Sequence, residues 1–137
     1  MGILRRYEFN PILSPEDMPE ECCAIYNSGA AKLKDGTYVM ASRFEEPNKT
    51  QKIWVSRSKD GINFIPDPEP VKIICDESER EIFDDIVWLN HNKGHLIGSW
   101  FDPRICPVEG KYYIVYCVGG DYNCRIAIAV TEDFKTL

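Results

Sequence analysis

The sequence lacks a long hydrophobic run, and none of its segments reaches the length that crosses a membrane. The N-terminus, Met1–Arg6, has no apolar core of the length found in secretory signal peptides. A basic stripe is also missing, and the 137 residues carry a formal net charge of −6; both argue against nucleic acid as the main partner. These absences predict a cytoplasmic protein with neither a membrane nor a nucleic acid as partner.

Paired metal-binding cysteines are absent as well. The chain has six cysteines, but none of them forms a C-x-x-C pair, and His91 and His95 do not stand near a cysteine at zinc-finger spacing. We therefore expect no metal and no cofactor. In a cytoplasmic protein the thiols are expected to be reduced. Cys117 and Cys124 lie across a predicted hairpin, and a disulfide between them is the alternative.

Sustained helical periodicity is the third absence, since no segment repeats apolar residues every 3.6 positions. Short apolar or alternating runs recur instead, with turn signals such as Asp35-Gly36 between them, which is an all-β pattern. One helical turn is expected after Ser14 as its N-cap. The predicted strands cover residues 22–33 (broken at 27–29), 37–44, 52–58, 62–65, 71–75, 111–118 and 124–130.

The chain contains an internal repeat. Residues 34–42 match residues 108–116, and residues 53–64 match residues 126–137 at the same offset to within one position. Each unit is predicted to hold four antiparallel strands, which is the pattern of a β-propeller blade. We predict one partial β-propeller domain over residues 1–137, with blade one at about 22–65, an insertion at 66–103 and blade two at about 104–137.

Trp100–Arg104, at the end of the predicted insertion and the start of blade two, is the stretch that most suggests chemistry. Insertions on one face of a repeat fold tend to build its binding face. Pro103 fixes its own φ at about −65° and disfavours helical backbone at Asp102, so the carboxylate is held beside two aromatic rings. Whether Arg104 points toward Asp102 stays open at this stage. A salt pair that caps a surface turn is the simpler alternative.

These motifs together resemble glycoside hydrolase family 130, whose members are phosphorylases and hydrolases of β-mannosides. Asn10–Leu13 is similar to the family's N-P-I/V-L segment, and Asn27–Ala31 to its N-S/P-A/G-A segment. Ser56–Phe64 is similar to the family's S-x-D-G-x-x-F/W turn. Phe101–Arg104 is similar to its E/Y-D-P-R signature. The resemblance spans residues 10–137 and implies roughly the first two blades of a five-bladed propeller.

The resemblance also implies an activity: inverting phosphorolysis of mannosyl-glucose or mannooligosaccharides, with inorganic phosphate as co-substrate. Asp102 matches the family's proton donor, which protonates the leaving oxygen while phosphate attacks from the opposite face. Phe101 departs from the family, which has Glu or Tyr at this position. Hydrolysis, with water as the nucleophile, is the alternative chemistry, and both stay open.

Five further residues are predicted to bind the carbohydrate substrate. Asn27 interrupts an apolar strand, which indicates either a polar group aimed into a cleft or a simple bulge. Arg43 and Arg57 occupy strand positions that could converge on one face, where a planar guanidinium suits sugar hydroxyls or phosphate. Solvated surface arginine is the alternative for both. The predicted set is Asn27, Ser28, Arg43, Arg57 and Arg104.

Two blades alone would expose strand edges and an apolar face. The sequence therefore predicts either further C-terminal blades after Leu137 or association of several copies into a homo-oligomer. A non-catalytic propeller unit that binds carbohydrate or self-associates is the alternative function.

Overall fold

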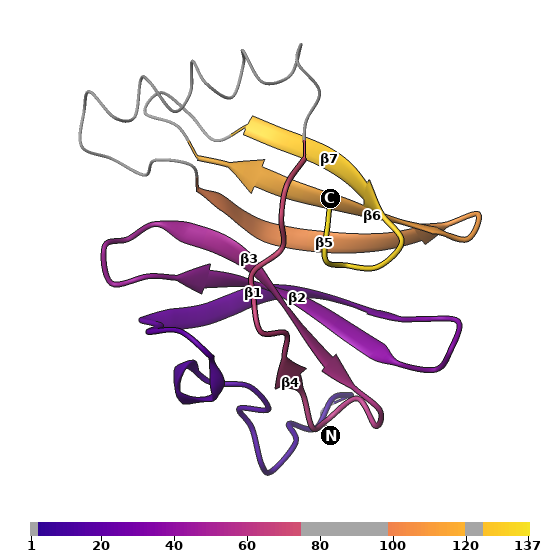
Figure 1. Cartoon of the computed structure of the whole chain (residues 1–137). Helices are drawn as coiled ribbons and strands as arrows, with labels where there is room; N and C mark the ends of the chain where they lie inside the picture. Colours follow the sequence, from indigo (N-terminus) through magenta and orange to yellow (C-terminus); the bar gives the residue numbers. More distant parts are fainter. Residues whose placement is uncertain (1–2, 75–98, 120–124) are drawn as a thin grey trace.

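The computed structural model describes residues 3–74, 99–119 and 125–137. Seven strands in this part of the chain form two antiparallel sheets that pack face to face (Figure 1). The predicted all-β class is confirmed, and two antiparallel sheets are consistent with two propeller blades. Among the described residues the helical structure is one short 3₁₀ helix, η1 (Pro15–Asp17), and no helix is long and apolar enough to cross a membrane.

Sheet one holds the first four strands in chain order. Asp35 organises the hairpin between the first two strands, because its carboxylate accepts hydrogen bonds from the backbone and the hydroxyl of Thr37, at 2.9 Å each. Gly36 completes that turn at φ 85°, a conformation that favours glycine. The strands are β1 (Ala24–Lys32), β2 (Tyr38–Glu45), β3 (Gln51–Ser58) and β4 (Ile65–Pro66).

Sheet two repeats the plan with three strands among the described residues. Gly110, which the repeat pairs with Gly36, also adopts φ 85° in the turn between the first two strands. Asp133 closes the turn after the third strand, accepting from the backbone N–H groups of Lys135 and Thr136 at 2.8 and 3.1 Å. The strands are β5 (Trp100–Val108), β6 (Lys111–Val118) and β7 (Arg125–Thr131).

The core lies between the two sheets, because the strands of each alternate apolar residues toward the other. Ile114 of β6, at 0% exposure, is fully buried there. A second apolar layer covers the outer face of sheet one, where the rings of Phe44 and Trp54 pack with centroids 4.8 Å apart. The inter-sheet core consists of Val39, Ala41, Ile53, Val55, Tyr112, Ile114, Tyr116, Val118, Phe134 and Leu137.

Three strand predictions need correction. The strand predicted at 62–65 starts only at Ile65, because Asp60 Oδ1 accepts from the backbone of Ile62 and Asn63 and holds them in a turn. The strand predicted at 71–75 is reduced to one parallel bridge between Lys72 and Thr136. The third correction concerns Trp100, which is the first residue of β5 and not part of an insertion.

The correction at β5 changes where the acidic motif sits. Trp100–Val108 is one strand, so sheet two begins before the predicted boundary at 104 and the motif lies inside its first strand. Proline is tolerated at this position because the register of β5 on β6 shifts between Phe101 and Arg104, a bulge where the ladder needs no N–H donor.

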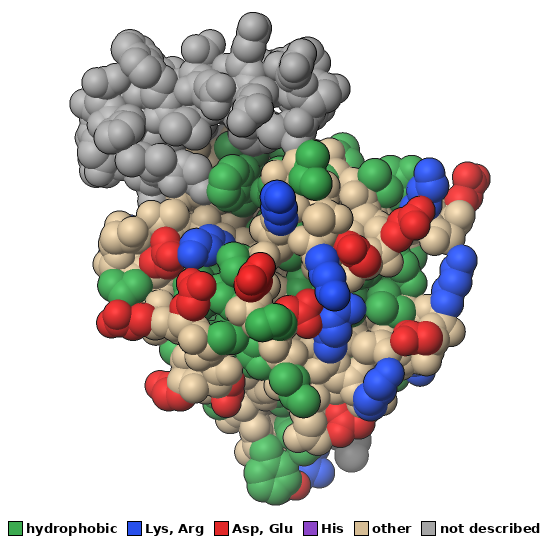
Figure 2. Space-filling model, in the orientation of Figure 1, with side chains coloured by type: hydrophobic (Ala, Val, Ile, Leu, Met, Phe, Trp, Pro, Cys, Tyr) green, Lys and Arg blue, Asp and Glu red, His purple; other side chains and the backbone are tan. Residues whose placement is uncertain are grey.

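Some predictions fall outside the described residues. His91, His95 and Cys124 lie there, so the alternative disulfide between Cys117 and Cys124 is not described. Across the described surface shown in Figure 2, acidic and basic side chains are interspersed and form no continuous basic patch.

Candidate active site

The candidate site forms where two strand bulges meet. β1 shifts its register between Tyr26 and Gly29, and β5 shifts its register between Phe101 and Arg104. Asn27 stands in the first bulge at φ 51° and Asp102 in the second at φ 56°. Asparagine and aspartate are the side chains that best tolerate this left-handed backbone. The same device therefore occurs in the first strand of both sheets.

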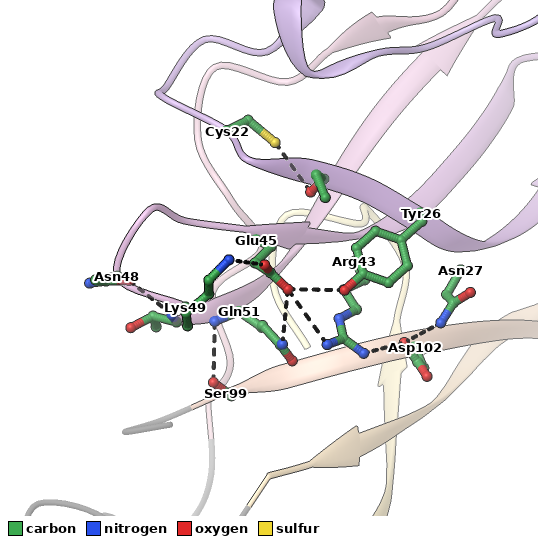
Figure 3. A network of polar contacts seen from close by, with 12 residues as sticks. Cys22, Tyr26, Asn27, Arg43, Glu45, Asn48, Lys49, Gln51, Ser99 and Asp102 are labelled. Atoms are coloured by element: carbon green, nitrogen blue, oxygen red, sulfur yellow. Dashed lines mark hydrogen bonds and ion pairs between the residues drawn. The ribbon is translucent and has the colours of Figure 1, made fainter. Parts of the chain in front are cut away.

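The two bulges face each other. Asn27 Nδ2 donates a hydrogen bond of 2.9 Å to Asp102 Oδ1 (Figure 3). Gly29 permits this closeness, since a Cβ on it would lie 2.7 Å from the carbonyl oxygen of Pro103 and 2.9 Å from the Cα of Arg104. The absence of a side chain at Gly29 thus lets β5 lie against β1.

Arg43 supplies the positive charge beside Asp102. Its Nη1 lies 3.3 Å from Asp102 Oδ1, and the side chains of the pair are 18% and 29% exposed. The guanidinium carbon lies 4.7 Å from the ring centroids of both Tyr26 and Phe101, one ring from each sheet. Cation–π contact on such rings favours a charged arginine in a partly dehydrated position.

A second carboxylate, Glu45, lies behind Arg43. Glu45 Oε2 accepts from the Tyr26 hydroxyl at 3.0 Å and stands 3.8 Å from Arg43 Nη2, while Oε1 accepts from Lys49 Nζ at 3.0 Å (Figure 3). The hydrogen bond from Lys49 lowers the pKa of Glu45, and Tyr26 and Arg43 act in the same direction against the effect of burial. Burial raises the pKa of Tyr26, and its bond to Glu45 adds to this. Glu45 is therefore an ionised acceptor and Tyr26 a neutral donor.

Arg104 does not serve as the counter-charge of Asp102. Its Nη1 donates to the backbone carbonyls of Asn27 and Pro103, both at 2.8 Å. This answers the question that the sequence left open: Arg104 ties the two bulges together, and Arg43 is the cation at the acid.

Two of the predicted binding residues lie away from Asp102. Ser28 shares a hydrogen bond of 2.7 Å with Ser42 Oγ, on the face of β2 opposite Arg43, and lines a pocket of about 440 Å³ with Met40 there. Arg57 makes a bidentate pair with Asp67, with Nε and Nη2 each 2.9 Å from a carboxylate oxygen. Arg43 and Arg57 share a face of sheet one, as predicted, but they do not converge, because Arg57 lies at the other end of β3, where it pairs with Asp67.

The sequence interpretation missed Tyr26 and Glu45. A usable signal existed for Glu45, since it follows Arg43 by two positions on one strand and must share its face. No comparable signal existed for Tyr26, whose place opposite Arg43 depends on the pairing register of β1 with β2.

The arrangement leaves part of the Asp102 carboxylate available. Asn27 and Arg43 both contact Oδ1, and Oδ2 has no hydrogen-bond partner among the residues that the structure describes. A carboxyl group with one fixed and one free oxygen can exchange a proton with a bound ligand. Within the same described part of the chain, no group of three His, Cys, Asp or Glu side chains is placed to hold a metal ion.

Fold and site together define a class: an all-β repeat protein whose candidate active site is one carboxylate, held between two sheets by an amide and a guanidinium. The chain belongs to glycoside hydrolase family 130, because residues 3–137 match that family's model, which is described as β-1,4-mannooligosaccharide phosphorylase.

Individual relatives agree with this assignment. The chain is 26% identical over 136 residues to a β-1,4-mannooligosaccharide phosphorylase from Ruminococcus albus, covering 98% of this chain and 37% of the relative. It is 29% identical over 141 residues to a 1,2-β-oligomannan phosphorylase from a Thermoanaerobacter species, covering 95% of this chain and 42% of that protein. The chain thus spans about two fifths of the length of these curated relatives.

A solved structure supports the fold. A glycosyl hydrolase from Bacteroides ovatus superposes with a TM-score of 0.71 at 23% identity, covering 98% of this chain and 39% of that chain. At that identity the likeness concerns the arrangement of the two sheets alone.

Proposed function

We propose that the whole protein is a β-mannoside phosphorylase in which Asp102 is the proton donor. The observation that carries the proposal is the geometry of Asp102, with Oδ1 held by Asn27 and Arg43 and Oδ2 free among the described residues. Membership of family 130 supports the substrate class. Because both curated relatives are named as phosphorylases, phosphorolysis is favoured over hydrolysis.

The proposed reaction needs one acid from this chain. Asp102 gives its proton, directly or through a sugar hydroxyl, to the oxygen that leaves the anomeric carbon. An oxygen of inorganic phosphate forms the new bond to that carbon from the opposite face, and the leaving sugar departs as a neutral alcohol. The products are mannose 1-phosphate and a shortened saccharide, with no cofactor required.

The remaining site residues divide by position. Asn27 and Arg43 lie within reach of a sugar bound at Asp102, and we assign them to substrate binding. Arg104 holds the backbone of the two bulges, so it acts on the shape of the site. Ser28 and Arg57 are assigned to the framework of sheet one, because their partners Ser42 and Asp67 satisfy them there.

We further propose that the two sheets are blades of a larger propeller. The face of sheet two that points away from sheet one carries Ile126 and Ile128, which are 76% and 69% exposed. A third sheet would bury such a stripe in the same way that sheet two buries sheet one. The same stripe favours the second candidate, a self-associating module without catalysis, in which another copy covers it.

Substitution of the acid tests the proposed activity. The whole protein is incubated with mannobiose or mannosyl-glucose, with and without phosphate, and mannose 1-phosphate and free mannose are measured. We expect phosphate-dependent release of mannose 1-phosphate and a loss of at least about 100-fold in kcat for Asp102→Asn, which cannot donate the proton.

The matched control is Glu132→Gln, which removes an exposed carboxylate from the turn after β7 and should leave the rate unchanged. Release of free mannose without phosphate would indicate the hydrolytic alternative. No product from the parent, or equal rates for the parent and Asp102→Asn, would exclude the proposal.

A further inference from the structure

The two aromatic rings that hold Arg43 do not by themselves fix the orientation of its guanidinium group. The rings of Tyr26 and Phe101 both lie 4.7 Å from its guanidinium carbon. Contact with ring faces attracts the cation but scarcely restricts its rotation in the plane. Arg43 Nε is buried and has no hydrogen-bond partner among the described residues. Rotation must therefore be restricted from the two ends, Nη1 and Nη2.

Those two ends meet two carboxylates. Nη1 lies 3.3 Å from Asp102 Oδ1, and Nη2 lies 3.8 Å from Glu45 Oε2. A planar guanidinium between two fixed anions takes one orientation. The position of Arg43 at the acid thus depends on Glu45 at its other end.

Glu45 is itself firmly placed. Its side chain is 15% exposed, and Tyr26, Lys49 and Gln51 donate to it at 3.0, 3.0 and 3.4 Å. The residue before β5 reinforces this arrangement, because the backbone N–H of Gln51 donates to the buried Ser99 Oγ at 3.2 Å. Donors from the protein contact both of its oxygens, and Arg43 lies between Glu45 and Asp102, so Glu45 stands away from the candidate acid.

We propose that Glu45 is a positioning residue, which fixes Arg43 and through it the orientation of Asp102 without touching the substrate. The inference rests on the proposed function of Asp102. Its consequence is specific: loss of the Glu45 charge slows the chemical step, because a displaced acid delivers its proton less often. Substrate affinity should change little, since Asn27 is not displaced and Arg43 stays charged between the rings of Tyr26 and Phe101, losing only its fixed orientation.

The first test compares Glu45→Gln with Glu46→Gln in the whole protein. Glu46 is the matched control, since it is the next residue, is also partly buried and pairs with Lys52 Nζ at 2.6 Å. We expect Glu45→Gln to lower kcat by about 10-fold to 100-fold with KM within about 2-fold, and Glu46→Gln to keep the parent kcat. Equal kcat values for the two variants of an active parent would overturn the inference and leave the proposed function standing.

A double variant tests whether Glu45 acts through Arg43. Arg43→Ala and Arg43→Ala/Glu45→Gln should have the same kcat, because Glu45 then has no guanidinium to hold. A double variant that is slower than Arg43→Ala by the full factor seen for Glu45→Gln alone contradicts this route.

Thermal unfolding keeps the inference testable when the parent releases neither mannose 1-phosphate nor mannose, an outcome that rejects the proposed function. Tm values of Arg43→Ala, Asp102→Ala and the double variant give the coupling between Arg43 and Asp102. We expect this coupling to shrink when the same set is made with Glu45→Gln and to persist with Glu46→Gln. An unchanged coupling with Glu45→Gln would overturn the inference.

Discussion

At equivalent positions of the internal repeat, single residues make the turns of the two sheets differ. The turn after β3 uses Gly61 at φ 77°, and the turn after β7 uses Phe134 at φ 60° in the corresponding place. In the first turn the ring of Tyr38 lies against Gly61, at 3.6 Å from where a Cβ would be. In the second, Phe134 is fully buried against Tyr112, with ring centroids 5.0 Å apart. Phe134 thus combines strained backbone with tight packing.

Replacement of Phe134 should separate these two contributions. Phe134→Ala loses the buried ring and keeps the strain, so we expect it to cost about 3 to 5 kcal/mol of unfolding free energy. Phe134→Gly loses the same ring but relieves the left-handed backbone, and it should be more stable than Phe134→Ala by about 1 kcal/mol. Urea denaturation measures both values.

The matched control for this pair is Ile114, which is buried on β6 with ordinary extended backbone. There glycine should be less stable than alanine. If Phe134→Ala proves more stable than Phe134→Gly, strain at this turn is not what distinguishes them.

At the level of strands, the site depends on how near β1 and β5 approach each other. Gly29 does not have the left-handed φ of the turn glycines; what it provides is room for the backbone of Pro103 and Arg104. The bulges on either side aim Asn27 and Asp102 at each other across that contact. The geometry of the acid is therefore a property of two strands together.

Gly29→Ala should move β5 away from β1. A Cβ within 2.7 to 3.0 Å of three backbone atoms forces the strands apart, so we expect a loss of about 1 to 3 kcal/mol in stability together with a large drop in the Asp102-dependent rate. Chemical denaturation and the phosphorolysis assay measure the two effects.

Gly36→Ala is the control for Gly29→Ala, because it adds strain at φ 85° with nothing within 4 Å of the new Cβ. It should lose stability and keep the rate. A Gly29→Ala protein with the parent rate would show that the close approach is not needed for the site.

Across the whole molecule, the internal repeat pairs the face of sheet one that sheet two covers with the exposed outer face of sheet two. The face of sheet one that packs on sheet two has apolar counterparts on the outer face of sheet two, in the same strand positions. The buried members are Val39, Ala41, Ile53 and Val55, and their counterparts are Tyr113, Val115, Ile126 and Ile128. By its own pattern, the outer face of sheet two is built to be covered by another sheet.

An isolated chain of residues 1–137 should therefore self-associate through that face. We expect its sedimentation-average mass to rise with concentration and Ile128→Glu to reduce this rise, because a charge on the stripe opposes its burial. Ile62→Glu, on a turn of sheet one where Ile62 is 40% exposed, is the control and should associate like the parent. Equal association of Ile128→Glu and the parent would contradict the assignment of the interface.

Local sequence patterns predicted the positions of strands and turns better than the contacts that these elements make. The strand at 111–118, the break in the first strand at Asn27 and the helical turn after Ser14 are confirmed, because each depends on neighbours in sequence. The strand at 62–65 failed since the side chain of Asp60 outcompeted the sheet for two backbone donors. The place of Trp100–Arg104 in β5 also escaped prediction, because a proline within a strand is recognisable only once the bulge is seen.

The sequence by itself determined the all-β class, the internal repeat and the choice of Asp102 as the candidate acid, since alternation, turn residues and the motif are all local features. Only the tertiary structure decided which groups accompany that acid. The sequence left open whether Arg104 pairs with Asp102; in the structure Arg43 is the cation at Asp102, and Arg104 donates to the carbonyls of the two bulges. The reason is that strand register and the close approach at Gly29 set these distances, and neither is encoded within a single segment.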